Sequence, residues 1–318
     1  MSNAFEGLQT VGSGSYAADD VHFLLRTMQI EVTDVQEKER LIQTRQRHYS
    51  EMISQEHPPS DTHKSLYRLA LAQNGARMAA DVQALAQALS QRYNGPTIAL
   101  VSFVRAGLPL GVLLRRALVE AGRDARHYGI SIIRDRGIDN VALEAIIKTH
   151  GAENIVFVDG WTGKGAISGQ IRDSLAGDSR FPADPRLVVL ADPCGRAWLA
   201  ASAEDWLIPS GILGATVSGL VSRSIWPQDP GLHGCVVYDH LAGHDVTQDF
   251  IHSIEAERAQ LAPRAAAQPW TPEQAQVLQH SAVAAVERIS TRFAVSNPNR
   301  VKPGLAEATR PVMRRVPD

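Results

Sequence analysis

NIVFVDGWTGKGAIS, residues 154–168, is the most informative stretch of this chain. An apolar run ends in one carboxylate, Asp159, a loop of Gly, Thr and Lys follows, and a helical pattern begins at Ala166. Buried parallel strands have such apolar runs, and their carboxyl ends are where α/β sheets bind ligands. The stretch therefore predicts a strand, a ligand-binding loop and a helix.

The chemistry of this loop suits a phosphate group. Its glycines let the backbone approach an oxyanion, and the start of the following helix presents free N–H groups to it. Lys164 adds a positive charge, and Asp159 is suited to Mg²⁺ or sugar hydroxyls. The loop is not a Walker A motif, because Val158 stands where that pattern needs Gly. The alternative interpretation is a turn that uses Gly only for its geometry.

Composition sets the broad class of the protein. The 318 residues suffice for one large domain or two ordinary ones, and 44% apolar with 21% charged residues is typical of a globular chain. A net charge of −2 provides no global attraction to nucleic acid or anionic lipid. No apolar stretch is long enough for a membrane span, and no signal peptide is visible. With Cys194 and Cys235 as the two cysteines, a disulfide framework is excluded and a cytoplasmic location is expected.

The middle of the chain alternates strands with helices. Strands are predicted at 97–103, 126–133, 155–158 and 187–190, and helices at 108–121, 141–149 and 166–175. This alternation predicts an α/β fold whose parallel sheet is flanked by helices. Weaker patterns indicate a strand at 235–238 and a helix at 246–261. We therefore assign residues 95–261 to an α/β core with its hood.

The two ends of the chain read as helical. Residues 1–94 are expected to form a helical segment with helices from Asp19 or Asp20 to about Met28, and at 34–55, 62–73 and 76–93. Residues 262–318 are expected to form a linker, a helix and a loose tail. Thr271, with Pro272 and Gln274, has the pattern of a helix N-cap.

Cationic residues follow three of the predicted strands. Arg105 comes after the first strand, Arg134 and Arg136 after the second, and Lys164 after the third. Because loops after neighbouring strands converge in a doubly wound sheet, we expect these side chains at one edge. Such a group favours a ligand with more than one phosphate. The alternative for each single Arg is solvation or pairing with a nearby Asp.

On these loops the chain resembles a type I phosphoribosyltransferase. The resemblance implies that Arg105, Ala106 and Gly107 grip pyrophosphate and that a mobile loop with Arg134 and Arg136 closes over the substrate. It also implies that the loop after the third strand holds phosphoribosyl pyrophosphate and its Mg²⁺ through Asp159, Gly160, Thr162, Gly163, Lys164 and Gly165. Asp159, Arg134 and Arg136 are then the candidate catalytic residues. Gly160 departs from the usual second carboxylate, and Gly163-Lys164-Gly165 departs from the usual Gly-Gly-Thr.

Longer motifs resemble a bacterial family described both as phosphoribosyltransferase-like and as cysteine protease StiP, which is associated with tellurite-resistance gene clusters. The resemblance covers about residues 12–255. It is carried by GSY at 14–16, HYSEM at 48–52, SIIRDRGID at 131–139, VDGWTGKG at 158–165 and ATVSGLVSR at 215–223. That family often carries a separate Pelota-like RNA-binding domain. None is recognised here, so no nucleic-acid partner is expected.

The residues leave three functions open. The first is an enzyme that forms or breaks an N-glycosidic bond between a phosphorylated ribose and a base-like acceptor, with Trp161 and Trp206 as base-stacking candidates. The second is a hydrolase using Cys235, which lies two residues from His233 on a strand, although a buried apolar Cys is the commoner case. The third is a nucleotide sensor without turnover, which the missing second carboxylate favours. A homodimer is left open as the oligomeric state.

Overall fold

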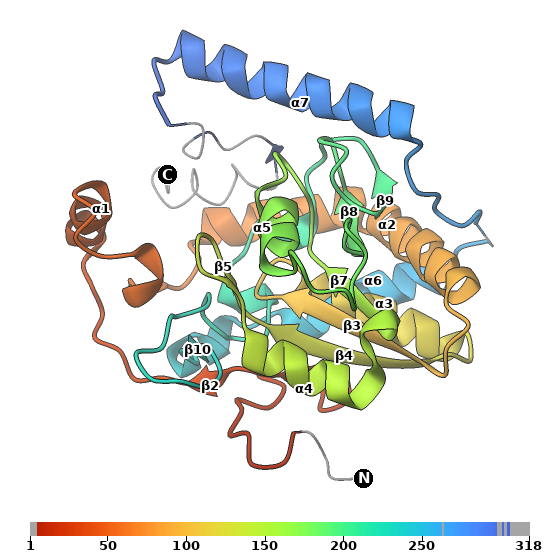
Figure 1. The fold of residues 1–318 in the computed structure, drawn as a ribbon, viewed down its shortest axis with the longest axis horizontal. Coiled ribbons are helices and arrows are strands. Elements are labelled where there is room, and N and C mark those ends of the chain that lie inside the picture. Colours follow the sequence, from red (N-terminus) through yellow and green to blue (C-terminus); the bar gives the residue numbers. More distant parts are fainter. Residues whose placement is uncertain (1–4, 263, 298–300, 302–303, 306–318) are drawn as a thin grey trace.

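The computed structural model describes residues 5–262, 264–297, 301 and 304–305, and it has an α/β architecture (Figure 1). One parallel sheet forms its centre, with strand order β1-β4-β3-β7-β8-β9. Its strands are β1 (His22–Phe23), β3 (Thr97–Phe103), β4 (Asp124–Ile130), β7 (Ile155–Val158), β8 (Leu187–Ala191) and β9 (Leu199–Ser202). The predicted fold class, a parallel sheet flanked by helices, is confirmed.

The strand order creates a ligand crevice. The second core strand, β4, lies on one side of β3, whereas the third, β7, lies on the other. Connections leave β3 and β7 in opposite directions, and the carboxyl ends of such a pair of strands form the crevice of a doubly wound sheet. The loop that follows β7 therefore lies beside the loop that follows β3.

Helices cover both faces of the sheet. One face packs against α2 (Asp61–Arg92), α3 (Leu108–Glu120) and α6 (Thr247–Arg258). The other face packs against α4 (Asn140–His150) and α5 (Ala166–Ser174). Strand residues alternate between these cores, and β7 is buried along its whole length, as expected of a central parallel strand.

The helix expected from Asp19 or Asp20 is wrong. The chain instead forms β1, which pairs with β4, and β2 (Arg26–Thr27), which pairs with β10 (Gly234–Cys235). Phe23 and Leu25 enter one core while Leu24 enters the other. Successive side chains in this stretch point to opposite faces of the strand, and both faces are apolar. That is the pattern of a strand buried on both sides.

Helix lengths in the N-terminal segment also differ from expectation. The helix expected at 34–55 is α1 (Val35–Gln43), which Asp34 caps, followed by a short 3-10 turn, η1 (Tyr49–Glu51). The two helices expected at 62–73 and 76–93 are the single helix α2. Gly75 lies inside it, where α6 packs closely through Ile254. The burial of α2 against the sheet, α3 and α6 offsets the cost of a helical glycine, about 1 kcal/mol.

The C-terminal predictions hold in part. The strand expected at 235–238 is the shorter β10, and the expected capping box of Thr271 and Gln274 is present at α7 (Pro272–Arg292). Figure 1 shows α7 at the periphery, and Gln279 donates a hydrogen bond to the Gly195 carbonyl oxygen at 2.9 Å. Most of the expected loose tail lies outside the described residues. Within the described parts of the chain, no helix has the length and apolar character needed to cross a bilayer.

Candidate functional site

A pocket of about 240 Å³ lies where the strand order predicts a ligand crevice. It is lined by residues from the loops after β3, β4 and β7 and from the start of α5. Of the residues singled out from the sequence, the pocket brings together Ala106, Arg134, Asp159, Trp161, Thr162, Gly163, Lys164 and Gly165. The other lining residues are Phe103, Val104, Ile132, Ala166 and Ile167.

Close packing between two loops shapes the floor of this pocket. A Cβ atom on Gly107 would lie 2.3 Å from the Val158 carbonyl oxygen, and one on Gly160 would lie 2.9 Å from the Ala106 carbonyl oxygen. Both distances are too short for a side chain. The missing carboxylate at position 160 thus has a steric reason, because the loop after β3 occupies its space.

Asp159 directly follows β7 and lines the pocket. Its residue is 6% exposed, and its Oδ1 accepts a hydrogen bond from the Gly160 N–H at 2.8 Å. This contact fixes the orientation of the carboxylate. Thr162, in contrast, is held by the fold, since its hydroxyl donates to the buried Asp192.

Asp192 holds the loop that follows β7 through its hydrogen bond with Thr162. In addition to Thr162 it accepts hydrogen bonds from the backbone of Arg196 and Ala197, at 3.0 and 2.8 Å, and from the indole of Trp270 at 2.9 Å. From the sequence, Asp192 is one of the nearby Asp residues offered as a partner for an Arg. The signal for its structural role is its position directly after β8 (Leu187–Ala191).

The start of α5 has the geometry of an anion site. Gly165 is its N-cap, with φ of +77°, and no side chain caps the helix. The first N–H groups of α5 therefore have no capping side chain as acceptor. Ala166 and Ile167, the first two residues of the helix, line the pocket, so these N–H groups are available to an anion there. Lys164 lies beside them, and its ammonium donates to the Val301 carbonyl oxygen at 2.7 Å.

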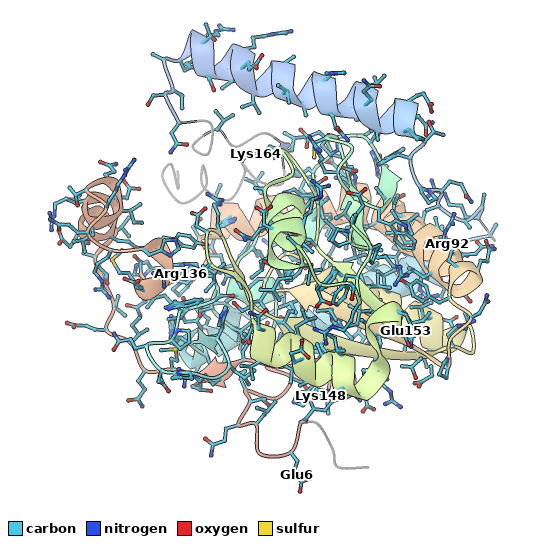
Figure 2. All side chains as sticks on the ribbon, in the orientation of Figure 1. Glu6, Arg92, Arg136, Lys148, Glu153 and Lys164 are labelled. Carbon is cyan, nitrogen blue, oxygen red and sulfur yellow. The ribbon has the colours of Figure 1, made fainter. Side chains whose placement is uncertain are left out.

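Two of the four expected cations lie outside the pocket lining. Arg105 pairs with Glu56 at 2.9 Å, and Arg136 pairs with Glu51 and lies over the Trp226 ring at 4.7 Å. Figure 2 shows Arg136 well separated from Lys164. Only Arg134 and Lys164, of the four, line the pocket.

Arg134 lies at the tip of a small hairpin. Its strands are β5 (Ile132–Ile133) and β6 (Gly137–Ile138), and the Arg134 backbone N–H donates to the Tyr49 hydroxyl at 2.8 Å. Asp139, which follows, is buried, caps α4 and accepts the His233 N–H. The loop after β4 is therefore bound to the N-terminal segment at its tip and to the core at its base.

The two tryptophans named as base-stacking candidates differ in position. Trp161 is half-buried and lines the pocket. Trp206 is 5% exposed, lies outside the pocket lining and packs under the Arg77 guanidinium at 4.6 Å. Trp206 is thus a core residue.

Both cysteines are buried free thiols. Cys235 is fully buried, and burial raises the pKa of its thiol to about 12. Burial, with Asp192 nearby, also raises the pKa of Cys194 to about 12. The Cys194 thiol lies 3.4 Å from both Thr162 Oγ1 and Asp192 Oδ1. It is therefore linked through Thr162 to the pocket, whereas Cys235 lies in the core.

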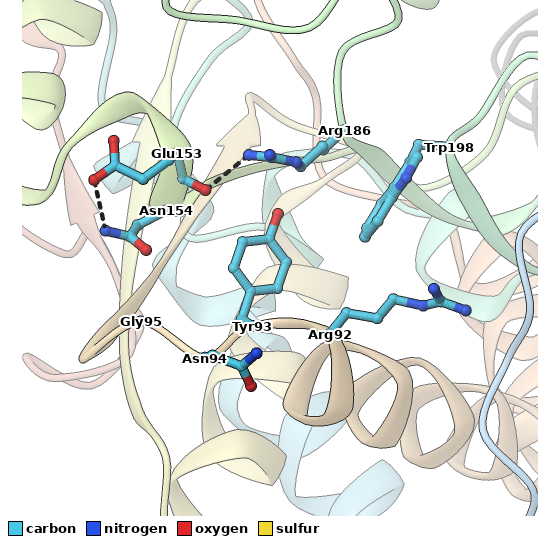
Figure 3. Close-up of a pocket in the computed structure, with 8 residues that line it drawn as sticks. All are labelled: Arg92, Tyr93, Asn94, Gly95, Glu153, Asn154, Arg186 and Trp198. Carbon is cyan, nitrogen blue, oxygen red and sulfur yellow. Dashed lines mark hydrogen bonds between the residues drawn. The ribbon is translucent and has the colours of Figure 1, made fainter.

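A second hollow, of about 220 Å³, lies at the other edge of the sheet (Figure 3). Gly95, Asn154, Arg186 and Trp198, which line it, each come just before a core strand. In a parallel sheet that is the amino edge, opposite the ligand crevice. The carboxyl-edge pocket is therefore the better candidate site.

The described residues contain no group of three His, Cys, Asp or Glu side chains suited to a metal ion. Asp159 is the carboxylate among the described residues of the pocket lining. One carboxylate fits Mg²⁺ held mainly by a bound phosphate ligand, since Mg²⁺ in such sites takes few protein ligands.

Structural similarity extends to purine phosphoribosyltransferases, at a low level. The hypoxanthine phosphoribosyltransferase of Trypanosoma cruzi matches with 16% identity and a TM-score of 0.30 over 41% of this chain and 77% of that one. A hypoxanthine-guanine enzyme from Leishmania tarentolae in complex with GMP matches with 15% identity and a TM-score of 0.29 over 55% and 93%. Similarity at this level carries no weight for function.

The C-terminal end matches a further family model. The PELOTA RNA binding domain matches residues 280–318, which include the second half of α7 and residues outside the described part. The expectation that the chain has no Pelota-like segment is therefore wrong. The motifs that carry the family resemblance lie between residues 14 and 223, and this match lies beyond them.

Sequence similarity is strong over most of the chain. The family model described as tellurite-like stress resistance cysteine protease StiP matches residues 14–255. A relative named cysteine protease StiP, from Acinetobacter baylyi, is 51% identical over 319 residues, which cover 96% of this chain and 83% of the relative. On these two matches the chain belongs to the StiP family.

Proposed function

We propose that the 240 Å³ pocket binds a phosphorylated ribose and that the chain forms or breaks an N-glycosidic bond between this ligand and a base-like acceptor. The observation that carries the proposal is the meeting of the uncapped start of α5, Lys164 and Asp159 in one pocket. Such a helix start and a cation together favour a phosphate group. A carboxylate nearby complements sugar hydroxyls, which donate hydrogen bonds to it.

Each pocket residue has a role in this proposal. Lys164 and the first N–H groups of α5 hold the 5-phosphate, and Asp159 accepts hydrogen bonds from the ribose. Trp161 provides a flat wall for a base. Arg134 stabilises the negative charge of the leaving group, because it is already positioned at the same pocket before reaction.

Mg²⁺ is the proposed cofactor. It would be held by the phosphates of the ligand with Asp159 and would supply charge neutralisation of those phosphates. Asp159 then has two partners, the metal and the ribose. The Asp159→Asn variant keeps the shape of this side chain but lacks the negative charge that Mg²⁺ needs.

Isothermal titration calorimetry tests the proposal. The intact chain should bind ribose 5-phosphate, and phosphoribosyl pyrophosphate more tightly when Mg²⁺ is present. Asp159→Asn should remove the Mg²⁺ dependence. Absence of binding to both compounds at millimolar concentration would exclude the proposal. Binding without turnover of phosphoribosyl pyrophosphate, over a panel of nucleobases, would assign the nucleotide-sensor alternative.

Cysteine-dependent hydrolysis is the second candidate, because the family description and the relative's name both state it. Cys194 is the better placed thiol, since it contacts Thr162 of the pocket. At a pKa of about 12 its thiolate is about one part in 10⁵ at neutral pH, far from an activated nucleophile. Loss of peptidase activity on casein in Cys194→Ala, with activity kept in Cys235→Ala, would support this candidate.

RNA is a further candidate partner, and it would bind the C-terminal end of the chain. Residues 280–318 match the PELOTA RNA binding domain and carry seven Lys and Arg against three Asp and Glu, in a chain whose net charge is −2. A basic segment binds the phosphate backbone and does so less well at high salt. Filter binding of single-stranded RNA by the full chain, at 50 and 300 mM KCl, tests this. RNA retention that is absent at both salt concentrations would exclude it.

A further inference from the structure

Aromatic rings and guanidinium groups meet in the 220 Å³ hollow at the amino edge of the sheet (Figure 3). Tyr93 and Trp198 line it, with their ring centroids 6.4 Å apart and their planes at 81°. Trp198 is half-buried, so part of its side chain remains accessible there. Arg92 and Arg186 line the same hollow, and in the view of Figure 3 the Trp198 ring lies between their guanidinium groups.

The two arginines give this hollow a positive character. Arg92 donates a hydrogen bond to the Gln268 side-chain oxygen at 2.9 Å, and Arg186 donates one to the Glu153 carbonyl oxygen at 2.7 Å. Both acceptors are neutral, so these bonds leave the two charges unbalanced. The Glu153 carboxylate is turned towards Asn154, whose Nδ2 lies 3.4 Å from Glu153 Oε1 (Figure 3).

Tyr93 has a hydrogen-bonding group that the described residues leave unsatisfied. Its side chain is 7% exposed, and its buried hydroxyl has no hydrogen-bond partner of good geometry among them. Arg186 lies beside it, with its guanidinium carbon 5.7 Å from the ring centroid. Buried hydroxyls nearly always have a partner, so a polar group is missing next to Arg186. A phosphate oxygen held by Arg186 would also accept a hydrogen bond from this hydroxyl.

We propose that this hollow binds a nucleoside monophosphate, with its base against Trp198 and its phosphate held by Arg92 and Arg186. Bases stack on aromatic side chains and on guanidinium planes, and the Arg fork matches phosphate oxygens. The hollow is smaller than the roughly 300–1,000 Å³ of ordinary ligand pockets, so it holds one ring system. Two guanidinium groups suit one phosphate, and a net charge of −2 does not attract a polyanion such as RNA.

The hollow is separate from the carboxyl-edge pocket. Gly95 and Asn154 come just before β3 and β7, whereas Phe103 and Asp159, which line the pocket, lie at the opposite ends of these strands. Both sites can therefore be occupied at the same time. A nucleotide at the amino edge is an additional ligand, and it does not compete with the phosphorylated ribose proposed for the pocket.

Calorimetry with AMP tests this site in the full chain. A Lys164→Ala background weakens phosphate binding at the pocket, so that the hollow is measured by itself. AMP should bind more tightly than adenosine or inorganic phosphate, because each of these lacks one half of the contacts. Arg186→Gln and Trp198→Leu should each lower AMP affinity about tenfold, through loss of a phosphate contact and of stacking respectively.

Arg40→Gln is the matched control for Arg186→Gln. It removes the same charge from α1, where Arg40 pairs with Glu37, and should leave AMP affinity unchanged. Thermal unfolding checks that each variant folds. If Trp198→Leu does not fold, Arg186→Gln still provides the test, since Arg186 is partly exposed.

Three results would overturn the proposal. The first is equal AMP affinity with and without Arg186→Gln. The second is AMP binding that disappears in Lys164→Ala alone, which would assign the nucleotide to the carboxyl-edge pocket. The third is a single-stranded RNA oligonucleotide that binds more tightly than AMP and loses affinity in Arg186→Gln, which would assign the hollow to RNA. Ribose 5-phosphate binding by the chain with Lys164 intact tests the pocket independently of all three.

Discussion

Lys164 stands out among single residues because it lines the pocket, and its ammonium donates a hydrogen bond to the Val301 carbonyl oxygen at 2.7 Å. A phosphate in the pocket would offer this ammonium a charge-assisted hydrogen bond. Lys164→Ala should therefore lower the affinity for ribose 5-phosphate by about 1.5–3 kcal/mol. The stability of the fold should change by less than about 1 kcal/mol.

Calorimetry and thermal unfolding measure both effects. Lys148→Ala is the matched control, since Lys148 is exposed on α4 (Figure 2) and lies outside the pocket lining. The control should bind like the wild type. Unchanged affinity in Lys164→Ala would place its ammonium outside the ligand contacts.

The two cysteines provide a second contrast at this scale. Cys235→Ser puts a hydroxyl into the fully buried core and should destabilise the fold by about 1–3 kcal/mol. Cys194→Ser places the hydroxyl beside Thr162 and Asp192 and should cost less. Urea unfolding of both variants measures the difference. Equal losses would mean that the environment of Cys235 is more polar than its burial indicates.

At the scale of elements, the contact between the loops after β3 and β7 is the tightest feature of the site. Gly160→Ala would place a Cβ atom 2.9 Å from the Ala106 carbonyl oxygen, so one loop must move. Because both loops line the pocket, we expect at least a tenfold loss of ribose 5-phosphate affinity, about 1.4 kcal/mol.

Gly169→Ala is the matched control for Gly160→Ala. A Cβ atom there meets nothing within 4 Å, and the residue is inside α5. It should stabilise the chain by about 0.5–1 kcal/mol and leave binding unchanged. Calorimetry measures the ribose 5-phosphate affinity of both variants. Full affinity in Gly160→Ala would show that the loops adjust without disturbing the pocket.

At the scale of the whole molecule, His127 connects distant parts of the chain. Its Nδ1 lies 2.8 Å from the Asp20 carbonyl oxygen and its Nε2 lies 2.7 Å from Ser102 Oγ. Burial lowers its pKa to about 4, from an ordinary value of 6.5. Between pH 6.5 and 4 the unfolded chain therefore binds more protons, and stability falls as the pH falls, by up to about 3 kcal/mol.

The unfolding free energy in urea, at pH 7.5 and pH 5, measures this effect. Asp81 acts in the opposite direction, because burial raises its pKa to about 6, so its contribution to stability grows as the pH falls from 6 towards 3.8. His127→Gln should reduce the loss at pH 5, while the exposed His252→Gln should not. A loss of the same size in His127→Gln would assign the pH dependence to other groups.

The features predicted correctly from the sequence are those whose causes are local. The strands β3, β7 and β8, the helix α5 and the capping box of Thr271 all follow from patterns within about ten residues. The pocket loop belongs to this class, because a strand end, glycines and a helix start are adjacent in the chain. This is why most of the predicted pocket residues lie together.

The features that depend on partners distant in the chain follow from tertiary contacts. Whether residues 21–28 form a helix or a strand depended on β4 and β10, which offered strand edges. Whether Arg105 and Arg136 face the pocket depended on Glu56 and Glu51, carboxylates about 50 to 85 residues away in the chain. A local sequence pattern carries no information on such partners. Because contacts with these partners determine which conformation has the lower free energy, neither outcome could be predicted from the sequence alone.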